Sequence, residues 1–339
     1  MDEPVSLGLI GAGRIGTSHA RVIAQDVPSA RLVAVADPRP AAAEALAHRH
    51  GARAFSDGLA LIDDPAVQGV VIAASSDAHA DLVVAAARAG KAVFCEKPMS
   101  LTLGDADRAL AAAEEAGVIL QVGFNRRFDP GFRAAHDAVT SGAVGTVQLM
   151  RSLTRDPGLA NPGAVPPWTI FLQTLIHDFD TLLWLNPGAE PVEVYATADA
   201  LVAPEFKEQG LLDTAVVVIT FDNGARAVAE ASFSAAYGYD VRGEVFGSRG
   251  MVTAGDGARS SMRLYTSGGL SHDTARGDVE LLGQAYAAEF VEFTAAVREG
   301  RAPSVTGADA RRALAVALAC IESVQTHRPA PVAEAGVLR

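Results

Sequence analysis

The sequence contains only two cysteines, Cys95 and Cys320. This excludes a disulfide framework and a cysteine-based metal site, so both are expected to be small core residues. Long hydrophobic runs are also absent, because the longest apolar stretches, such as Ala215–Phe221, are far too short to span a bilayer. The acidic start, Met1–Pro4, lacks the basic residues of a signal peptide. These absences predict a cytoplasmic protein with no membrane partner.

Positive charge is scarce as well. The chain has 28 Lys and Arg against 40 Asp and Glu, a net charge of −12. An acidic chain without a basic run lacks the electrostatic footprint of a protein that binds nucleic acid or an anionic membrane. Its histidines are scattered without ligand spacing, so no metal is expected. The composition is otherwise ordinary for a globular protein, and 339 residues exceed one typical core, which favours two domains.

Residues 1–123 alternate between short apolar strands and helices. Strands are predicted at 7–10, 31–37, 70–74, 92–95 and 118–123, and helices at 14–25, 41–50, 77–90 and 103–117. Continuous apolar strands that alternate with helices indicate a parallel sheet covered on both faces. Right-handed crossovers then predict a doubly wound first domain over residues 1–123.

After residue 123, strands and helices are grouped instead of alternating. Helices are predicted at 129–140, 172–185, 281–299 and 309–326, and strands at 147–154, 192–200, 214–221, 225–234 and 242–246. Asp222-Asn223-Gly224 predicts a hairpin turn, and the Pro/Gly-rich composition of residues 161–167 predicts a loop. This grouping predicts an α+β second domain over residues 124–339.

A glycine turn links the first predicted strand to the first helix. Gly11-Ala12-Gly13-Arg14-Ile15-Gly16 matches the G-x-G-x-x-G pattern of dinucleotide-binding turns. Gly11 would permit the tight turn, Gly13 would let the backbone approach a pyrophosphate, and Gly16 would let helix and strand pack closely. The N–H groups at the helix start, at Arg14 and Ile15, would bind the phosphates. The alternative is an ordinary glycine-rich turn.

Further cofactor contacts are predicted where the next strands end. Asp37 can accept hydrogen bonds from both hydroxyls of the adenosine ribose of NAD and would repel the 2′-phosphate of NADP. Arg39 could soften that repulsion, but NAD is the expected cofactor; alternatively, Asp37 is a plain helix N-cap. Ser75, Ser76 and His79 follow the third strand and could line the nicotinamide ribose, although His79 could equally be a first-turn helix residue.

Two segments carry groups for hydride chemistry. Oxidation of an alcohol needs a group that takes the hydroxyl proton and donors that stabilise the developing alkoxide. Lys97, in Glu96-Lys97-Pro98, follows an apolar strand at the ligand-binding edge, although most lysines are surface charges. Gln173 and His177 are four residues apart and share a helix face, so His177 is a candidate base, although a lone helical histidine is usually structural. Asp178 follows His177 directly, but on a regular helix its side chain would point about 100° away from that of His177.

With these segments in view, the sequence resembles the glucose–fructose oxidoreductase and inositol dehydrogenase (Gfo/Idh/MocA) family, and within it the inositol 2-dehydrogenases. The resemblance runs nearly the whole length and is carried by residues 8–16, 92–98, 123–129, 174–180, 236–242 and 244–247. It implies a Rossmann domain followed by an α+β domain built on a large, mostly antiparallel open sheet. It also implies an NAD-dependent oxidoreductase of cyclitol ring hydroxyls, and a homo-oligomer, commonly a tetramer, formed through the open sheet face.

The resemblance assigns roles to individual side chains. Lys97 would hold the reacting hydroxyl, and His177 would be the general base. Glu96, Lys97 and Asn125 would lie at the cofactor. The polyol pocket would be lined by Arg127, Asp156, Thr174 and Tyr237.

The chain departs from the family at one catalytic position. The family places an aspartate four residues before the histidine, where this chain has Gln173. A glutamine can bind substrate or orient His177, but it cannot carry charge or accept the proton, so Lys97 and His177 should prefer their neutral forms more. Three readings stay open: slower or pH-shifted inositol oxidation; a different cyclitol or sugar, as in a sugar dehydrogenase or ketosugar reductase; or a non-catalytic dinucleotide-binding regulatory protein.

Overall fold

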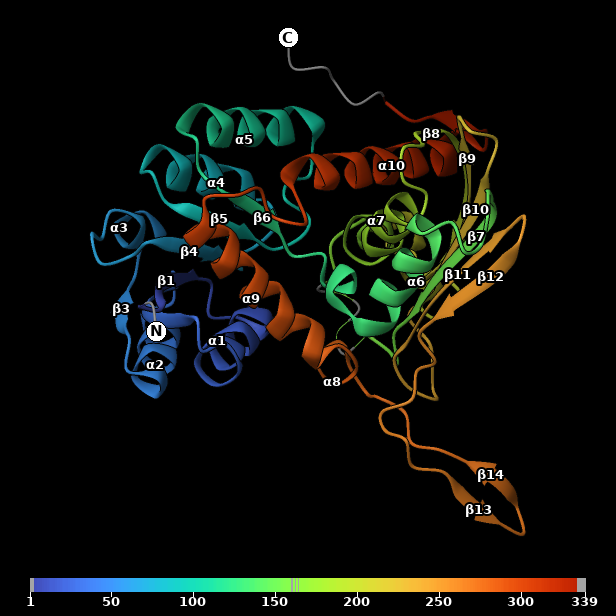
Figure 1. Ribbon diagram of the computed structural model, residues 1–339, viewed down its shortest axis with the longest axis horizontal. Coiled ribbons are helices and arrows are strands. Elements are labelled where there is room, and N and C mark those ends of the chain that lie inside the picture. The colour runs from blue at the N-terminus through green and yellow to red at the C-terminus, as the bar shows by residue number, and fades with distance from the viewer. Residues whose placement is uncertain (1–2, 160, 162, 164, 334–339) are drawn as a thin grey trace. The chain divides into compact units, whose positions relative to one another are not determined.

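The computed structural model describes residues 3–159, 161, 163 and 165–333, which form two compact units (Figure 1). The first contains the chain up to Phe128 together with Gln284–Leu314, and the second contains Asp129–Gly283 and the described chain from Ala315 onward. By packing, residues 284–314 therefore belong with the first unit. The functional boundary that we expect after residue 123 stays a prediction.

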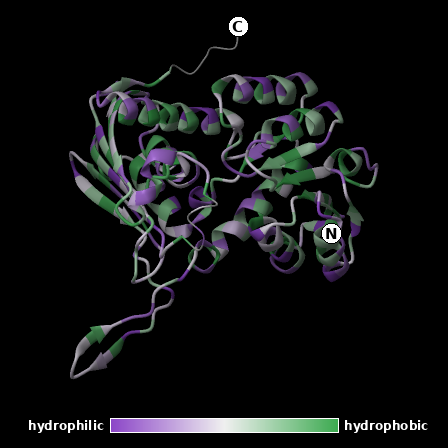
Figure 2. Cartoon of the chain, turned by 180° about the vertical axis from the view of Figure 1, so that it is seen from behind, coloured by the Kyte–Doolittle hydropathy of each residue, from purple (hydrophilic) through white to green (hydrophobic). Residues whose placement is uncertain are grey.

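A six-stranded parallel sheet, in the order β3-β2-β1-β4-β5-β6, is the core of the first unit. Its strands are β1 (Val5–Ile10), β2 (Ala30–Ala36), β3 (Arg53–Phe55), β4 (Gly69–Ile72), β5 (Ala92–Cys95) and β6 (Leu120–Val122). They are mostly apolar (Figure 2), and β4 and β5 are wholly buried, as in a sheet covered on both faces. The strand order reverses between β1 and β4, where doubly wound folds bind ligands. The predicted Rossmann fold is confirmed.

Eight helical segments accompany this sheet: α1 (Arg14–Asp26), α2 (Pro40–His50), α3 (Gly58–Ile62), α4 (His79–Arg88), α5 (Leu103–Ala116), the 3₁₀ helix η1 (Asn125–Phe128), α9 (Gly283–Glu299) and the first turns of α10 (Gly307–Thr326). Local signals set their ends. The Thr102 hydroxyl caps α5 by accepting the N–H of Asp105, and Gly117 ends that helix in the left-handed conformation. The short β3 and α3 were not predicted.

The second unit is built on a seven-stranded sheet in the order β12-β11-β7-β10-β9-β8-β15, in which only the β7–β10 pair is parallel. Its strands are β7 (Val147–Arg155), β8 (Pro191–Asp199), β9 (Thr214–Phe221), β10 (Arg226–Ser232), β11 (Asp240–Gly247), β12 (Gly250–Ala254) and β15 (Ala330–Pro331). The predicted turn joins β9 to β10, with Gly224 at a φ of 88°. The mostly antiparallel open sheet is confirmed.

One face of this sheet is covered and the other is open. Along β9, Val217 and Ile219 are buried, whereas Val216 and Val218 are exposed. The unit also contains α6 (Pro130–Thr140), the π-helix η3 (Ile170–Leu175), α7 (Ile176–Trp184), the 3₁₀ helix η4 (Pro204–Gln209), α8 (Asp278–Leu281) and the later turns of α10. A hairpin of β13 (Leu264–Thr266) and β14 (Gly269–Ser271) extends away from the sheet (Figure 1).

The helix predicted over residues 172–185 begins earlier than expected and starts as a π-helix. The wider π turn changes the local spacing of side chains just before His177, a feature common at functional sites. Of the predicted loop at residues 161–167, residues 162 and 164 lie outside the described part of the chain. Within the described residues, no helix combines the length and apolar character needed to cross a membrane.

Candidate active site

The glycine turn between β1 and α1 has the geometry of a phosphate-binding turn. Gly11 has a φ of 105°, and a Cβ there would overlap the backbone of Ala73 after β4. A Cβ at Gly16 would overlap the carbonyl oxygen of Gly11, so only glycine lets α1 pack this closely. Gly13 has open space where a Cβ would lie, and no side chain caps the start of α1 at Arg14. Gly11 and Gly16 therefore have the steric roles that we expect, whereas the approach of a pyrophosphate to Gly13 and the helix start stays a prediction.

Asp37 lies against this turn at the end of β2. Its buried carboxylate accepts the N–H of Ala12 (2.8 Å) and three donors of Arg39, namely its N–H (2.9 Å), Nε (3.0 Å) and Nη2 (3.3 Å). Burial alone would raise the pKa of Asp37, but these donors outweigh it and hold the pKa below its usual value. The N-cap residue of α2 is Arg39, so Asp37 is not a plain helix cap. An ionised carboxylate stands where the adenosine ribose is expected.

The segment after β4 adds the predicted Ser75, Ser76 and His79. Ser75 is exposed and Ser76 is half-buried. His79 is buried, with Nδ1 2.8 Å from the carbonyl oxygen of Pro98 and Nε2 3.0 Å from that of Ala74. His79 therefore ties the start of α4 to the Lys97–Pro98 segment. Cofactor contacts of all three residues stay predictions.

Glu96 and Lys97 follow β5 at the same edge of the sheet. The buried Glu96 places Oε1 2.6 Å from Nε2 of His19, and its Oε2 accepts the N–H of Lys97 (3.1 Å). Lys97 itself is half-buried. Sequence reasoning missed His19, although it is the one histidine of α1 and lies three residues after the glycine turn.

Asn125 and Arg127 lie in η1, directly after β6, and both are buried. Nη2 of Arg127 is 3.1 Å from Oδ1 of Asp309, near the start of α10. Burial alone would raise the pKa of Asp309, but the charge of Arg127 and the donors of Thr306 outweigh it and hold the pKa below its usual value. The first unit thus holds Arg127 by an ion pair that the sequence did not reveal, and its predicted contact with substrate stays a prediction.

In the second unit, η3 carries Gln173 and Thr174, and the first turn of α7 carries His177. Gln173 and His177 are half-buried and Thr174 is buried. The next residue, Asp178, is fully buried and accepts the hydroxyls of Ser152 (2.5 Å) and Thr154 (2.6 Å) on β7. Asp178 therefore fastens α7 to the sheet and faces β7.

Asp156 and the Tyr237 segment meet at one edge of the second sheet. Because β7 and β10 run parallel, their carboxyl ends lie side by side. The N–H of Asp156 donates to the carbonyl of Ser232 (2.9 Å), and its carbonyl accepts the N–H of Ala235 (2.8 Å). These bonds place Asp156 beside the segment that leads to Tyr237, and the substrate contacts of both residues stay predictions.

Hydrogen bonds fix the hydroxyl of Tyr237. It donates to Asp240 (2.7 Å), which is fully buried and also accepts Nε (2.7 Å) and Nη2 (2.9 Å) of Arg242. Burial and the hydrogen bond to Asp240 raise the pKa of Tyr237, and Arg155 offsets part of this rise. Tyr237 is thus a neutral hydrogen-bonding group. Asp240, which holds it, was not among the predicted site residues.

Side chains of the kinds that hold metal ions gather at one place among the described residues, where His19, Glu96 and Glu289 lie together. The expected absence of a metal stays a prediction. Lys97 and His177 belong to different units, so their action as a catalytic pair also stays a prediction.

Comparisons with known proteins agree with both units. Residues 5–124 match the oxidoreductase family with an NAD-binding Rossmann fold, and residues 132–253 match the GFO/IDH/MocA C-terminal domain. The chain is 38% identical over 342 residues to myo-inositol 2-dehydrogenase of Thermotoga maritima, covering 97% of this chain and 98% of that protein. It is 34% identical over 332 residues to scyllo-inositol 2-dehydrogenase (NAD(+)) of Bacillus subtilis, covering 97% and 95%.

A solved structure agrees over the same length. The crystal structure of scyllo-inositol dehydrogenase from Lactobacillus casei, with bound NAD(H) and scyllo-inositol, has a TM-score of 0.93 and 27% identity, covering 98% of this chain and 100% of that one. The expected NAD-dependent oxidoreductase is confirmed by these matches. The chain therefore belongs to the Gfo/Idh/MocA oxidoreductase family.

Proposed function

We propose that the chain oxidises a ring hydroxyl of a cyclitol, with myo-inositol or one of its stereoisomers or derivatives as substrate. The observation that carries the proposal is similarity over nearly the full length to proteins named as inositol dehydrogenases. Bound NAD would supply the hydride acceptor. The ring carbon loses a hydride and its hydroxyl loses a proton, which gives the ketone, NADH and a released proton.

Lys97 would hold the oxygen of the reacting hydroxyl. It follows β5 at the carboxyl edge of the sheet, the edge that also presents the glycine turn after β1 and Asp37 after β2. The hydrogen bond from its N–H to Glu96 supports a fixed backbone at this point. Its amino group could then donate to the oxygen and stabilise the negative charge that develops as the proton leaves.

His177 would take the hydroxyl proton. It is half-buried at the start of α7, and the buried Asp178 anchors that helix to β7. A fixed histidine suits a general base, because its ordinary pKa lies close to neutrality. The presence of both Lys97 and His177 favours an enzyme over a non-catalytic dinucleotide-binding protein.

The polyol ring would contact Asp156, Thr174 and Tyr237 in the second unit, and Arg127 from the first. Tyr237 suits this role because its hydroxyl is held neutral by Asp240 and can exchange hydrogen bonds with ring hydroxyls. Arg127 is committed to Asp309, so it could donate to substrate only through its remaining N–H groups.

Gln173 favours a second candidate function, that of a sugar dehydrogenase or ketosugar reductase. It stands where the resemblance to the family implies an aspartate, and the Asp178 carboxylate accepts two hydroxyls of β7. A neutral amide at this point would change which hydroxyl pattern the pocket prefers, because an amide both donates and accepts hydrogen bonds.

We also propose that the open face of the second sheet forms a homo-oligomer interface, with a tetramer favoured. Large apolar side chains lie exposed in opposed pairs on this face: Leu149 and Met251 flank Phe246, and Tyr195 lies opposite Val218. Patches of this kind commonly mark protein interfaces. Light scattering of the purified protein tests the assembly, and a monomer would overturn it.

The deciding experiment is NADH formation by the purified protein with myo-, scyllo- and D-chiro-inositol, glucose, xylose and galactose, each with NAD and NADP. Efficient NADH formation with an inositol supports the cyclitol proposal. Turnover of a sugar with no inositol activity would replace it with the second candidate. If no compound gives NADH although the protein binds NAD, this result would count against both enzymatic proposals.

A further inference from the structure

A cluster of polar side chains is buried behind Lys97 in the first unit. His19 on α1, Glu96 after β5 and Glu289 on α9 form it, and we refer to these three as the buried triad. Their nitrogen and carboxylate oxygens lie within 4.8 Å of one another. Glu96 is the central member, because one oxygen meets Nε2 of His19 at 2.6 Å and the other accepts the N–H of Lys97 at 3.1 Å.

The surroundings of the triad leave little room for solvent. The His19 ring meets the rings of Phe94, Tyr286 and Phe290 edge-on, with centroids 5.9, 5.8 and 4.9 Å away. On the side of β6, a Cβ at Gly123 would lie 3.3 Å from the Glu96 carboxyl group. A charge placed here is therefore poorly hydrated and interacts strongly with its neighbours.

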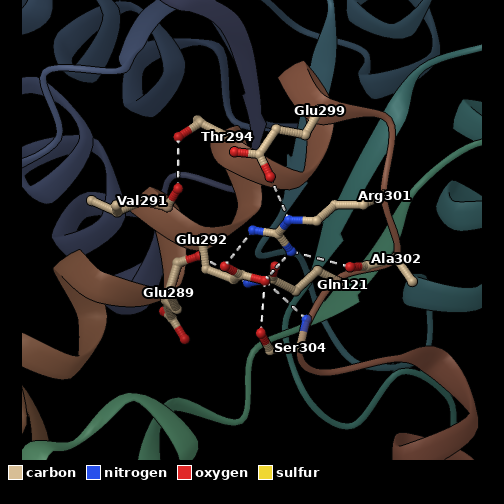
Figure 3. A network of polar contacts seen from close by, with 9 residues as sticks. All are labelled: Gln121, Glu289, Val291, Glu292, Thr294, Glu299, Arg301, Ala302 and Ser304. Carbon is tan, nitrogen blue, oxygen red and sulfur yellow. Dashed lines mark hydrogen bonds and ion pairs between the residues drawn. The ribbon is translucent and has the colours of Figure 1, made fainter.

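The two carboxyl groups of the triad are in different situations. Glu96 has two hydrogen-bond partners, whereas neither side-chain oxygen of Glu289 has a hydrogen-bond partner among the described residues. Only the backbone of Glu289 is engaged, its carbonyl accepting Nε2 of Gln121 (2.8 Å). In Figure 3 the Glu289 carboxyl points away from the exposed network of Glu292 and Arg301 on the same stretch of chain.

Opposite electrostatic effects follow for the two groups. Burial would raise the pKa of Glu96, but the hydrogen bond and charge of His19 and the nearby Lys97 outweigh it and lower the pKa. Burial raises the pKa of Glu289 well above its ordinary value, and the charge of Glu96 raises it further. Such divergence assigns the proton to Glu289 and the charge to Glu96.

We propose that Glu289 is a positioning residue that acts on Lys97 through Glu96. As a neutral acid, Glu289 leaves Glu96 as the one ionised carboxylate of the triad. The Glu96 carboxylate accepts the backbone N–H of Lys97 and interacts with the positive charge of the Lys97 side chain. The inference rests on the proposed catalytic role of Lys97. Ionised Glu289 would put a second negative charge beside Glu96, where it would compete for His19 and disturb the hold on Lys97.

Among the described residues, the other titratable groups that face Glu289 come from α9, α1 and the end of β5. Tyr286 precedes it by one turn on α9, His19 faces it from α1, and Cys95 and Glu96 end β5. The buried Cys95 thiol has a pKa well above its ordinary value, because burial and the charge of Glu96 disfavour the thiolate. Cys95 therefore stays neutral, and Glu289 is the carboxyl group of the triad that keeps its proton.

The test compares wild-type protein with Glu289→Gln, which keeps the shape but cannot ionise. With NAD and the best polyol, the alkaline limb of kcat/KM should move to higher pH by at least about half a unit in the variant. The matched control is Glu292→Gln, one turn along α9 and outside the triad, which should leave this limb in place. Superimposable profiles of wild type and Glu289→Gln would overturn the proposal.

A second measurement needs no turnover. Folded Glu289 keeps a proton that the unfolded chain releases above its ordinary pKa, so wild type should lose stability with rising pH relative to Glu289→Gln. The ratio of their unfolding constants should change about tenfold per pH unit over pH 5–7. If Glu289→Gln does not fold, Glu289→Met is compared instead, since it is also neutral and similar in volume.

The outcomes separate this inference from the proposed function. A pH-independent stability ratio would overturn the neutral state of Glu289, as would a stoichiometric divalent metal that wild type binds and the variant loses. Absence of polyol turnover by wild type, with a tenfold ratio per pH unit retained, would overturn the proposed function and leave the neutral Glu289 standing.

Discussion

Replacing Arg39 by alanine should tighten binding of NAD. The Asp37 carboxylate offers about four acceptor positions. The N–H groups of Ala12 and Arg39 and two donors of the Arg39 guanidinium fill them. The two ribose hydroxyls of NAD can therefore be accepted only after the guanidinium moves away. Arg39→Ala removes that competitor and keeps both backbone donors.

The exposure of the pair sets the magnitude of this effect. The Arg39 side chain is 70% exposed and Asp37 only 6%. An ion pair with so exposed a partner is weak, so its removal should lower KM for NAD by about two- to fivefold. The turnover number should not change, because the contact is to the adenosine ribose. Use of NADP should weaken, because the variant loses the cation that could offset Asp37 against the 2′-phosphate.

Steady-state KM values for NAD and NADP, at saturating polyol, measure both effects. Arg49→Ala is the control, since it removes one exposed positive charge from the same α2 helix without touching Asp37. An unchanged or higher KM for NAD in Arg39→Ala, or improved use of NADP, would refute the competition between Arg39 and the ribose.

Three further predictions concern catalysis and stability. Lys97→Ala and His177→Ala should each lower kcat by at least about a hundredfold while NAD affinity, measured by fluorescence titration, survives; wild-type turnover by either would reject its role. Asp178→Ala should cost about 2–4 kcal/mol in urea unfolding, because it removes two buried hydrogen bonds to a carboxylate. Glu292→Gln should cost about 1–2 kcal/mol near neutral pH after allowing for solvent screening. Arg301 lowers the pKa of Glu292 to about 2, so the difference should vanish as the pH falls from about 4.5 toward 2, and a constant difference would contradict it (Figure 3).

Much of the first unit could be predicted because its signals are local. The strand, glycine turn and helix over residues 5–26 occupy one continuous stretch, in which Gly16 packs against the backbone of Gly11 and Gly11 packs against the backbone of Ala73. Asp37 could be placed because a parallel strand delivers its last residue to a known edge of the sheet. The Asp222-Asn223-Gly224 turn likewise specifies its own geometry.

The contacts that the sequence did not predict join residues that are far apart in the sequence. Glu289 meets Glu96 only because α9 packs in the first unit, and no periodic pattern connects the two segments. The ion pair of Arg127 and Asp309 is hidden for the same reason. The π-helical start at Ile170–Leu175 was missed because apolar spacing fits either helix type over one or two turns.

Gln173 bears on the protonation of His177, because it places a neutral amide where the family pattern has a carboxylate. The Asp178 carboxylate accepts the hydroxyls of Ser152 and Thr154 on β7, so we do not expect it to replace the aspartate of the family pattern at position 173. Gln173→Asp should restore a negative charge one turn before His177 and stabilise its protonated form. The acid limb of kcat/KM for polyol oxidation should then move to higher pH by about one unit, because the base must first lose its proton.

The substrate panel completes this test. If Gln173 selects the substrate, Gln173→Asp should also change the order of kcat/KM values among inositols and sugars, whereas a purely electrostatic role moves the pH limb and leaves that order intact. Gln173→Glu adds the same charge on a longer side chain, so comparing it with Gln173→Asp distinguishes the effect of the charge from the effect of side-chain length. An unmoved limb in both variants would mean that residue 173 does not act on the proton acceptor, and the general-base assignment of His177 would lose its support from the family pattern.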